Sequence, residues 1–259
     1  MAENPGTAYN PLFIYGQSGL GKTHLLHSIA NRVKRNHPSY RIMYIKSEDF
    51  VNELIGNLRR GADMQAFRDK YRNVDLFLMD DVQFVAGRAA TQEELFHTFN
   101  SLYELKKQIV FTSDRPPKEI KSLEDRLRTR FEWGLTADIQ PPDFETRVAI
   151  ITRKAALLGM ELPEEVCEFI AKRLKNNIRQ LEGAVKKLSA YRSLSGIHPT
   201  IGAAQNAIKD INDREKIKEH IKEVLGYKDE LIPQIKITDK KTVFRKIRNT
   251  VLLFYGVGI

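Results

Sequence analysis

The chain lacks most features of a secreted or membrane protein. Its only cysteine, Cys167, excludes an internal disulfide, and the neighbouring Val166 and Phe169 indicate a small buried side chain instead. No apolar run reaches about 18 residues, so we expect no transmembrane helix. The polar residues 1–6 lack the charged start and the apolar core of a signal peptide. Together these absences favour a cytoplasmic globular protein.

Positive charge, by contrast, is in excess. The 259 residues carry a formal net charge of +9, which favours anionic partners and above all nucleic acid. The excess is uneven, because residues 212–259 hold eleven Lys and Arg against seven Asp and Glu. Solubility alone is the alternative explanation for this charge.

Two kinds of segment alternate in the first half of the chain, and no internal repeat interrupts them. Short apolar runs predict buried strands over residues 12–15, 42–45, 76–79, 108–112 and 134–137. Longer periodic segments predict helices over residues 22–35, 49–58, 64–71 and 91–106. In the first helix, Leu25, Leu26, Ile29 and Val33 are expected on one face. This alternation predicts an α/β fold with a parallel sheet that is covered by helices on both faces.

The pattern changes at Pro141-Pro142, a pair that can continue neither a helix nor a central strand. Beyond it only helices are predicted, over residues 144–158, 163–174, 178–194 and 201–211. We therefore predict a nucleotide-binding α/β domain over residues 1–141 and a small all-α lid domain over residues 142–211. Residues 212–259 are interpreted as a linker and a candidate partial DNA-binding domain.

A complete phosphate-binding loop follows the first predicted strand and opens the first predicted helix. Residues 16–23 read Gly-Gln-Ser-Gly-Leu-Gly-Lys-Thr and match the P-loop pattern in full. Glycines let backbone N–H groups point at phosphates, and the helix N-terminus adds partial positive charge. In such a loop Lys22 reaches the β- and γ-phosphates and Thr23 offers its hydroxyl to Mg²⁺. The pattern predicts ATP and Mg²⁺ as cofactors, with Gly16, Gln17, Ser18, Gly19, Leu20, Gly21, Lys22 and Thr23 at the nucleotide.

An acidic pair, Asp80-Asp81, ends the third predicted strand. Alone, such a pair is more typical of a turn, but beside a P-loop it predicts a catalytic role. We expect Asp80 to hold Mg²⁺ and Asp81 to polarise the attacking water as a general base. An aspartate is one methylene shorter than a glutamate, so Asp81 suggests slow hydrolysis, as in a switch.

Three further polar sites are candidates for a functional role, and two of them also have a structural interpretation. Asp114, after the fourth strand, can sense the γ-phosphate or can cap the following turn. Arg126 and Arg130 are four residues apart on one helical face, either as a phosphate-binding pair for a neighbouring subunit or as solvated surface groups. Arg179, in the first turn of a helix where a cation is unfavourable, is a candidate nucleotide contact.

In combination these segments resemble the DnaA family of bacterial replication initiators, which are AAA+ ATPases. The resemblance covers roughly residues 2–211 and is carried by residues 9–16, 21–27, 80–84, 112–117, 124–127 and 179–183. It implies that Asp114 is the first sensor, Arg126 the arginine finger and Arg179 the second sensor, and it adds His24 to the nucleotide contacts. It also implies ATP-dependent self-assembly on origin DNA followed by unwinding, with a replicative helicase and acidic phospholipids as further partners.

The resemblance further implies a channel for single-stranded DNA. The family's initiator-specific insertion corresponds to residues 48–71, which places an apolar DNA contact at Ile55 and a basic one at Arg88. A second basic position of the family is Ala90 here, so we expect part of the strand contact to be weaker. The family's segment before the P-loop is only partly represented, and its signature for reading double-stranded DNA does not occur in residues 212–259.

Two alternatives to an initiator stay open at this point. A helicase-loader ATPase of the same fold would depend on a helicase hexamer, and a regulatory AAA+ module would act through protein contacts without turnover. The presence of Lys22, Thr23, Asp80 and Arg126 argues against the second alternative.

Overall fold

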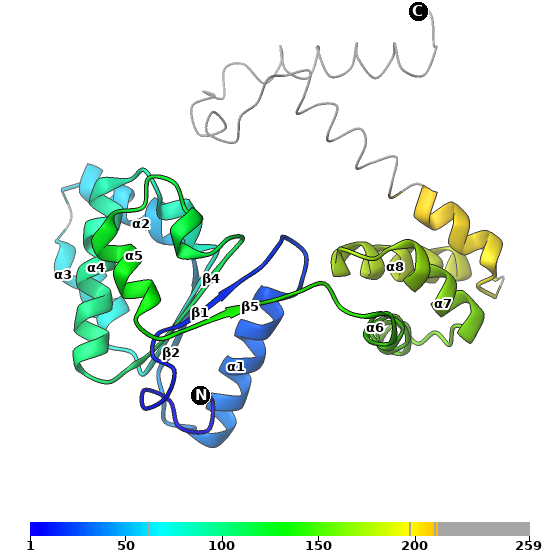
Figure 1. Ribbon diagram of the computed structural model, residues 1–259, viewed down its shortest axis with the longest axis horizontal. Helices are drawn as coiled ribbons and strands as arrows, with labels where there is room; N and C mark the ends of the chain where they lie inside the picture. The colour runs from blue at the N-terminus through cyan, green and yellow to red at the C-terminus, as the bar shows by residue number, and fades with distance from the viewer. Residues whose placement is uncertain (62, 197, 210, 212–259) are drawn as a thin grey trace, which may run out of the picture. The chain divides into compact units, whose positions relative to one another are not determined.

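The computed structural model describes residues 1–61, 63–196, 198–209 and 211 (Figure 1). The described residues form two compact units, one of Met1–Ala149 with Leu174–Leu181 and one of Ile150–Arg173 with the described residues that follow Leu181. The domain boundaries expected after residues 141 and 211 stay predictions. The interpretation of residues 212–259 lies outside the described residues.

A five-stranded parallel sheet forms the centre of the first unit, in the order β2-β3-β4-β1-β5 (Figure 1). The strands are β1 Leu12–Tyr15, β2 Ile42–Lys46, β3 Leu76–Asp80, β4 Gln108–Ser113 and β5 Leu135–Asp138. The predicted parallel sheet is confirmed, and β4 lies beside β1. All strand carboxyl ends therefore meet at one edge, where the P-loop and the acidic pair lie.

Five α-helices and two short 3-10 helices surround this sheet. They are α1 Lys22–Asn36, α2 Ser47–Arg59, α3 Met64–Arg72, η1 Val82–Val85, α4 Ala89–Glu104, η2 Pro117–Glu119 and α5 Asp125–Glu132. The 3-10 helices had no counterpart in the sequence prediction. Since η1 directly follows Asp80 and Asp81, it redirects the chain at the acidic pair.

The central strands β1, β3 and β4 are largely apolar, because helices cover both faces of the sheet there. Alternate strand residues belong to two separate clusters, as the period of two requires. One cluster joins Ile14, Leu78 and Val110 to α1, and the other joins Phe13, Phe77 and Phe111 to α2, α3, α4 and α5. Leu25 was expected on the buried face of the first helix but is 38 % exposed, because that face is already filled by Leu26, Ile29 and Val33.

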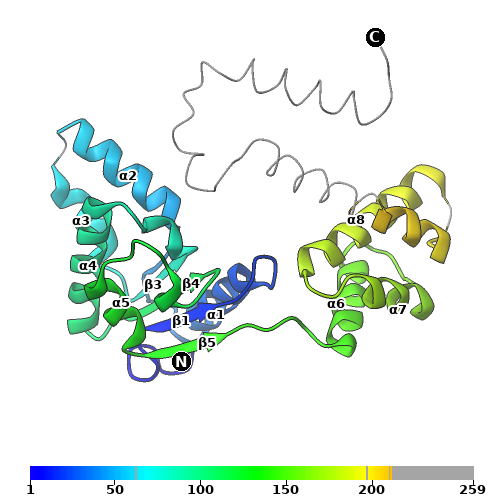
Figure 2. The same ribbon diagram turned by 45° about the horizontal axis from the view of Figure 1, so that its top comes forward.

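Among the described residues, every helix or strand after β5 is a helix, as predicted (Figure 2). They are α6 Phe144–Leu157, α7 Glu164–Arg173 and α8 Ile178–Ser195, and residues 201–209 are also helical. Cys167 is 2 % exposed, which confirms it as a core residue. Among the described helices, none combines the length and the apolar character that crossing a bilayer requires.

Candidate active site

The P-loop connects β1 to α1 at the carboxyl edge of the sheet. Two of its glycines are required by backbone geometry. Gly21 has φ 93° directly before α1, and Gly19 has φ 89°, both in the left-handed region that favours glycine. A Cβ on Gly19 would also lie only 2.2 Å from the Asn177 Oδ1 atom. The loop therefore presents backbone rather than side chains to the space above the strand ends.

Lys22 is the one buried cation of this loop, with 7 % of the residue exposed. Its Nζ atom donates to the Gly16 carbonyl at 2.5 Å and to the Gln17 carbonyl at 3.0 Å. Burial lowers the pKa of Lys22, while the carboxylates of Asp81, Asp114 and Asp80 act in the opposite direction. An anion beside this ammonium would therefore be bound strongly, because it would replace the lost hydration.

Three hydroxyl groups from different elements hold the Asp80 carboxylate, which is 2 % exposed. Thr23 of α1 donates to Asp80 Oδ2 at 2.7 Å, and Tyr44 of β2 donates to the same atom at 3.1 Å. Thr112 of β4 donates to Asp80 Oδ1. The predicted metal pair, Thr23 and Asp80, is thus brought into direct contact.

Asp81 has an unusual backbone conformation for a residue other than glycine, with φ 56° and ψ 51°. Its amide N–H donates to Thr112 Oγ1 at 3.0 Å, and its carbonyl accepts from the Ser47 hydroxyl. Its half-buried carboxylate accepts from Gln83 Nε2 at 3.3 Å. The carboxylate that was predicted as a general base is thus held at the same strand edge as Lys22.

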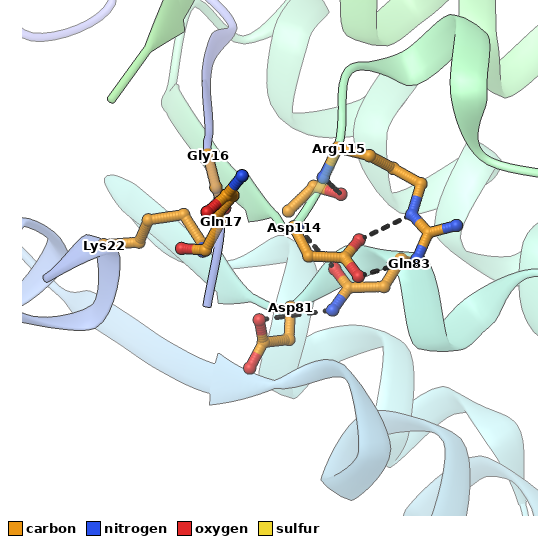
Figure 3. Close-up of polar contacts among 8 residues, drawn as sticks. Gly16, Gln17, Lys22, Asp81, Gln83, Asp114 and Arg115 are labelled. Atoms are coloured by element: carbon orange, nitrogen blue, oxygen red, sulfur yellow. Dashed lines mark hydrogen bonds and ion pairs between the residues drawn. The ribbon is translucent and has the colours of Figure 1, made fainter. Parts of the chain in front are cut away.

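Asp114 lies on the same side of the site as Asp81, opposite Gly16, Gln17 and Lys22 (Figure 3). The amide of Asp114 donates to Gln83 Oε1 at 3.4 Å, so Gln83 bridges Asp81 and Asp114. Arg115 makes a two-pronged ion pair with the Asp114 carboxylate at 2.9 and 2.8 Å. The turn-capping role belongs to Ser113, whose Oγ accepts from the Arg115 amide at 3.3 Å.

Arg126 and Arg130 lie on one face of α5, as their spacing predicts. Both guanidiniums are over the Phe96 ring, at 4.9 and 5.4 Å from its centroid. The Arg126 side chain is 41 % exposed and pairs with Glu124 at 2.6 Å. Arg130 is half-buried, donates to Asn100 Oδ1 at 2.9 Å and stacks on Trp133 at 3.7 Å. Of the two arginines, Arg126 is therefore the exposed one, and Arg130 is held by neighbouring side chains.

The remaining nucleotide candidates lie in the loop or next to it. Gln17, Ser18 and His24 are exposed, and Leu20 is buried. The amide of Ile178 donates to the Gly19 carbonyl at 3.0 Å, which brings the first turn of α8 to the P-loop within the first unit. Arg179 in that turn is exposed and helps to lower the pKa of Lys22, after the larger effect of burial.

The two predicted DNA contacts, Ile55 and Arg88, also belong to the first unit. Ile55 of α2 is half-buried against the core cluster beneath that helix. Arg88 is half-buried and precedes α4 directly, where its carbonyl accepts from the amides of Thr91 and Gln92 at 2.9 Å each. Ala90 is exposed in the first turn of α4. Ile55 thus lies on a helix that packs on η1, and η1 ends three residues before Arg88.

Sequence reasoning missed several residues that support this site, namely Tyr44, Ser47, Gln83 and the hydroxyl of Thr112. A signal existed for three of them. Thr112 directly follows the apolar run 109–111, Tyr44 is the one hydroxyl-bearing residue of its predicted strand, and Gln83 is a polar residue between Val82 and Phe84. Ser47 lies among the charged residues 46, 48 and 49, so nothing local distinguishes it.

The model of the bacterial DnaA ATPase domain family matches residues 1–138, which is more than half of the chain. The chain belongs to the DnaA family. The chromosomal replication initiator protein DnaA of Caldanaerobacter subterraneus subsp. tengcongensis is 53% identical over 211 residues. That similarity covers 82% of this chain and 47% of the relative, so the chain spans about half the length of this curated DnaA.

Solved DnaA structures share the fold. Domain III of the Thermotoga maritima replication initiation protein DnaA has a TM-score of 0.78 and 48% identity, covering 81% of this chain and 87% of that one. A replication initiator DnaA bound to AMPPCP and single-stranded DNA has a TM-score of 0.69 and 37% identity, covering 93% of this chain and 72% of that one. The predicted AAA+ fold and the resemblance to DnaA are both confirmed.

Proposed function

We propose that this chain is the ATPase module of a DNA replication initiator. It binds Mg·ATP, assembles with further copies of itself on origin DNA, engages single-stranded DNA and promotes unwinding, with slow hydrolysis as a switch. The observation that carries the proposal is the 2.7 Å contact of the Thr23 hydroxyl with Asp80, which joins the P-loop to the end of β3. Membership of the DnaA family supports it, since a related DnaA binds AMPPCP and single-stranded DNA.

The residues present fit a magnesium nucleotide. Thr23 and Asp80 offer hard oxygen donors, and the described residues contain no cluster of three or more His, Cys, Asp or Glu that could bind a metal alone. This suits Mg²⁺, which is usually held by one or two protein oxygens together with phosphates. When bound, Mg²⁺ neutralises developing charge on the phosphates. Lys22 and the P-loop amides bind the phosphates, and His24 and Arg179 complete the contacts.

For hydrolysis we assign Asp81 as the base that accepts a proton from the attacking water. Asp114, with its backbone bridged to Asp81 through Gln83, is the proposed first sensor of the terminal phosphate. Because Asp81 is one methylene shorter than the glutamate of most AAA+ proteins, slow turnover is expected.

We assign Arg126 as the arginine finger that completes the site of a neighbouring copy. Its pair with Glu124 is exposed, and exposed pairs contribute little, so a phosphate can replace that carboxylate. Arg126→Ala should leave ATP binding of the monomer within about twofold and abolish ATP-dependent assembly. Turnover should fall by about 10³-fold, the lower range for such residues. The measurement is sizing by light scattering with ATP or ADP, together with phosphate release.

Arg130→Ala is the matched comparison, because Arg130 shares the Phe96 ring but is held by Asn100 and Trp133. Arg153→Ala, an exposed arginine of α6, controls for loss of charge. Normal ATP-dependent assembly of Arg126→Ala would make Arg126 a surface residue. If only Arg130→Ala failed to assemble, the finger would move to Arg130, whose guanidinium is already fixed in place.

Single-stranded DNA binding should require ATP and weaken as salt rises. Contacts to phosphates release counterions, so log affinity should fall by about 0.7 per neutralised phosphate for each unit of log salt concentration. Arg88→Ala should reduce this slope, whereas Ile55→Ala should weaken binding at every salt concentration with the slope unchanged. Fluorescence anisotropy of a labelled oligonucleotide over a salt series measures both quantities.

The same titration should be repeated with a duplex that carries origin boxes and with a scrambled duplex. We expect weak duplex binding with little sequence preference. A strong preference for the origin duplex would contradict this expectation and would assign duplex reading to residues 212–259. Equal salt slopes for Arg88→Ala and the parent would remove Arg88 from the interface.

Family membership favours an initiator over a helicase loader, because the matched relatives are DnaA proteins. A loader would require a helicase hexamer for assembly, and a regulatory module would show no turnover. We also propose that the chain is cytoplasmic. A replicative helicase and acidic phospholipids are its proposed further partners. Sizing with ATP, with and without single-stranded DNA, separates the first two alternatives.

A further inference from the structure

The backbone of Asp81 is held on both sides by side-chain hydroxyls. Thr112 Oγ1 accepts the amide N–H of Asp81 at 3.0 Å, and the Ser47 hydroxyl donates to the carbonyl oxygen of Asp81. Both hydroxyl residues are fully buried, at 0 % exposure. They come from β4 and from the first turn of α2, on segments that are more than sixty residues apart in sequence.

These two hydrogen bonds stabilise a backbone conformation that Asp81 would rarely adopt unaided. At φ 56° and ψ 51° the residue is left-handed, and its Cβ is close to the following carbonyl oxygen. Fixing the peptide groups before and after Asp81 fixes φ and ψ, and these angles set the direction of the Cα–Cβ bond. The direction of the carboxylate therefore depends on Ser47 and Thr112, although neither contacts the carboxylate itself.

We propose that Ser47 and Thr112 are positioning residues that hold Asp81 in the left-handed conformation from which its carboxylate faces the P-loop. The proposal rests on the proposed function of Asp81 as the general base. The two hydroxyls differ in how many acidic residues they contact. Thr112 also donates to Asp80 Oδ1 and so holds both acidic residues, whereas Ser47 holds only Asp81.

This difference predicts different defects. Ser47→Ala should lower kcat by about tenfold, part of the roughly 10²- to 10⁴-fold contribution of a general base, with ATP affinity and Mg²⁺ dependence unchanged. Thr112→Val, which keeps the shape of the side chain, should lower kcat and also raise the Mg²⁺ concentration for half-maximal turnover. Thr112→Ser restores the hydroxyl and should recover both. The measurement is phosphate release over ATP and Mg²⁺ series on the full chain.

A double variant separates positioning from general damage to the fold. If Ser47 acts through Asp81, adding Ser47→Ala to Asp81→Asn should lower the residual turnover no further. A change in stability alone would lower turnover in both backgrounds. Ser193→Ala, an exposed serine of α8 that donates to the Ser189 carbonyl, is the matched control.

The parent chain tests the proposed function itself, since absence of any ATP turnover by the parent would reject it independently of Ser47. If the parent turns over and Ser47→Ala matches it in kcat, the positioning role of Ser47 is overturned. Should Ser47→Ala fail to fold or to bind ATP, the Thr112 pair decides. Equal kcat for Thr112→Val and Thr112→Ser would then overturn the proposal.

Discussion

Lys22→Ala is expected to abolish ATP binding, with affinity reduced at least about 100-fold. Hydrogen bonds to charged groups contribute about 1.5–3 kcal/mol each, and each 1.4 kcal/mol is about tenfold in affinity. Because the Lys22 ammonium is buried beside the P-loop carbonyls, no other cation of the loop can replace it. Isothermal titration with ATP and Mg²⁺ measures the effect.

The Lys22 variant needs a control for folding, since its ammonium also donates to the Gly16 and Gln17 carbonyls. Thermal unfolding without nucleotide should stay close to the parent, because those carbonyls remain accessible to water once the side chain is removed. Lys121→Ala, at an exposed position, controls for charge. ATP affinity within about twofold of the parent, well under 1 kcal/mol, would show that the P-loop interpretation is wrong.

Asp81→Asn is expected to stop hydrolysis while Mg·ATP stays bound. An amide cannot accept the proton of the attacking water, and a general base contributes roughly 10²- to 10⁴-fold to the rate. Asparagine also tolerates the left-handed conformation that residue 81 adopts, so the hydrogen bonds from Ser47 and to Thr112 should persist. Single-turnover hydrolysis and equilibrium ATP binding give the two quantities separately.

Asp80→Asn is the matched comparison for Asp81→Asn, because the two residues are adjacent and the chemical change is the same. Here the expected defect is weaker Mg²⁺ binding, since Asp80 contacts the Thr23 hydroxyl at the predicted metal position. Raising the Mg²⁺ concentration should recover turnover in Asp80→Asn but not in Asp81→Asn. Identical responses of the two variants to Mg²⁺ would contradict their separate roles.

The central strands were predictable because they direct apolar residues to both faces of the sheet. The continuous apolar runs 76–79 and 109–111 reflect burial under helices on each side of the sheet. Helix ends were less predictable. The helix expected from Thr91 begins at Ala89 instead, because the carbonyl of Arg88 accepts from the amides of Thr91 and Gln92. No side chain caps this helix start, so the sequence carries no local signal for it.

The pair of arginines on α5 shows a limit of local reasoning. Spacing placed Arg126 and Arg130 on one helical face, and both contact Phe96. Their different burial depends on Asn100 and Trp133, which come from α4 and from the end of α5. Only packing between helices therefore distinguishes a solvent-exposed arginine from one that is fixed in place.

The sequence by itself determined the phosphate-binding chemistry of the P-loop, because its functional residues lie in one short segment. The P-loop carries its glycines, Lys22 and Thr23 within eight consecutive residues, because a phosphate is enclosed by contiguous backbone. The partners of the acidic pair were decided by tertiary structure alone. The parallel register of β2, β3 and β4 brings Tyr44, Ser47 and Thr112 to Asp80 and Asp81. A hydrogen bond depends on distance in space, which a sequence does not record for residues on different strands.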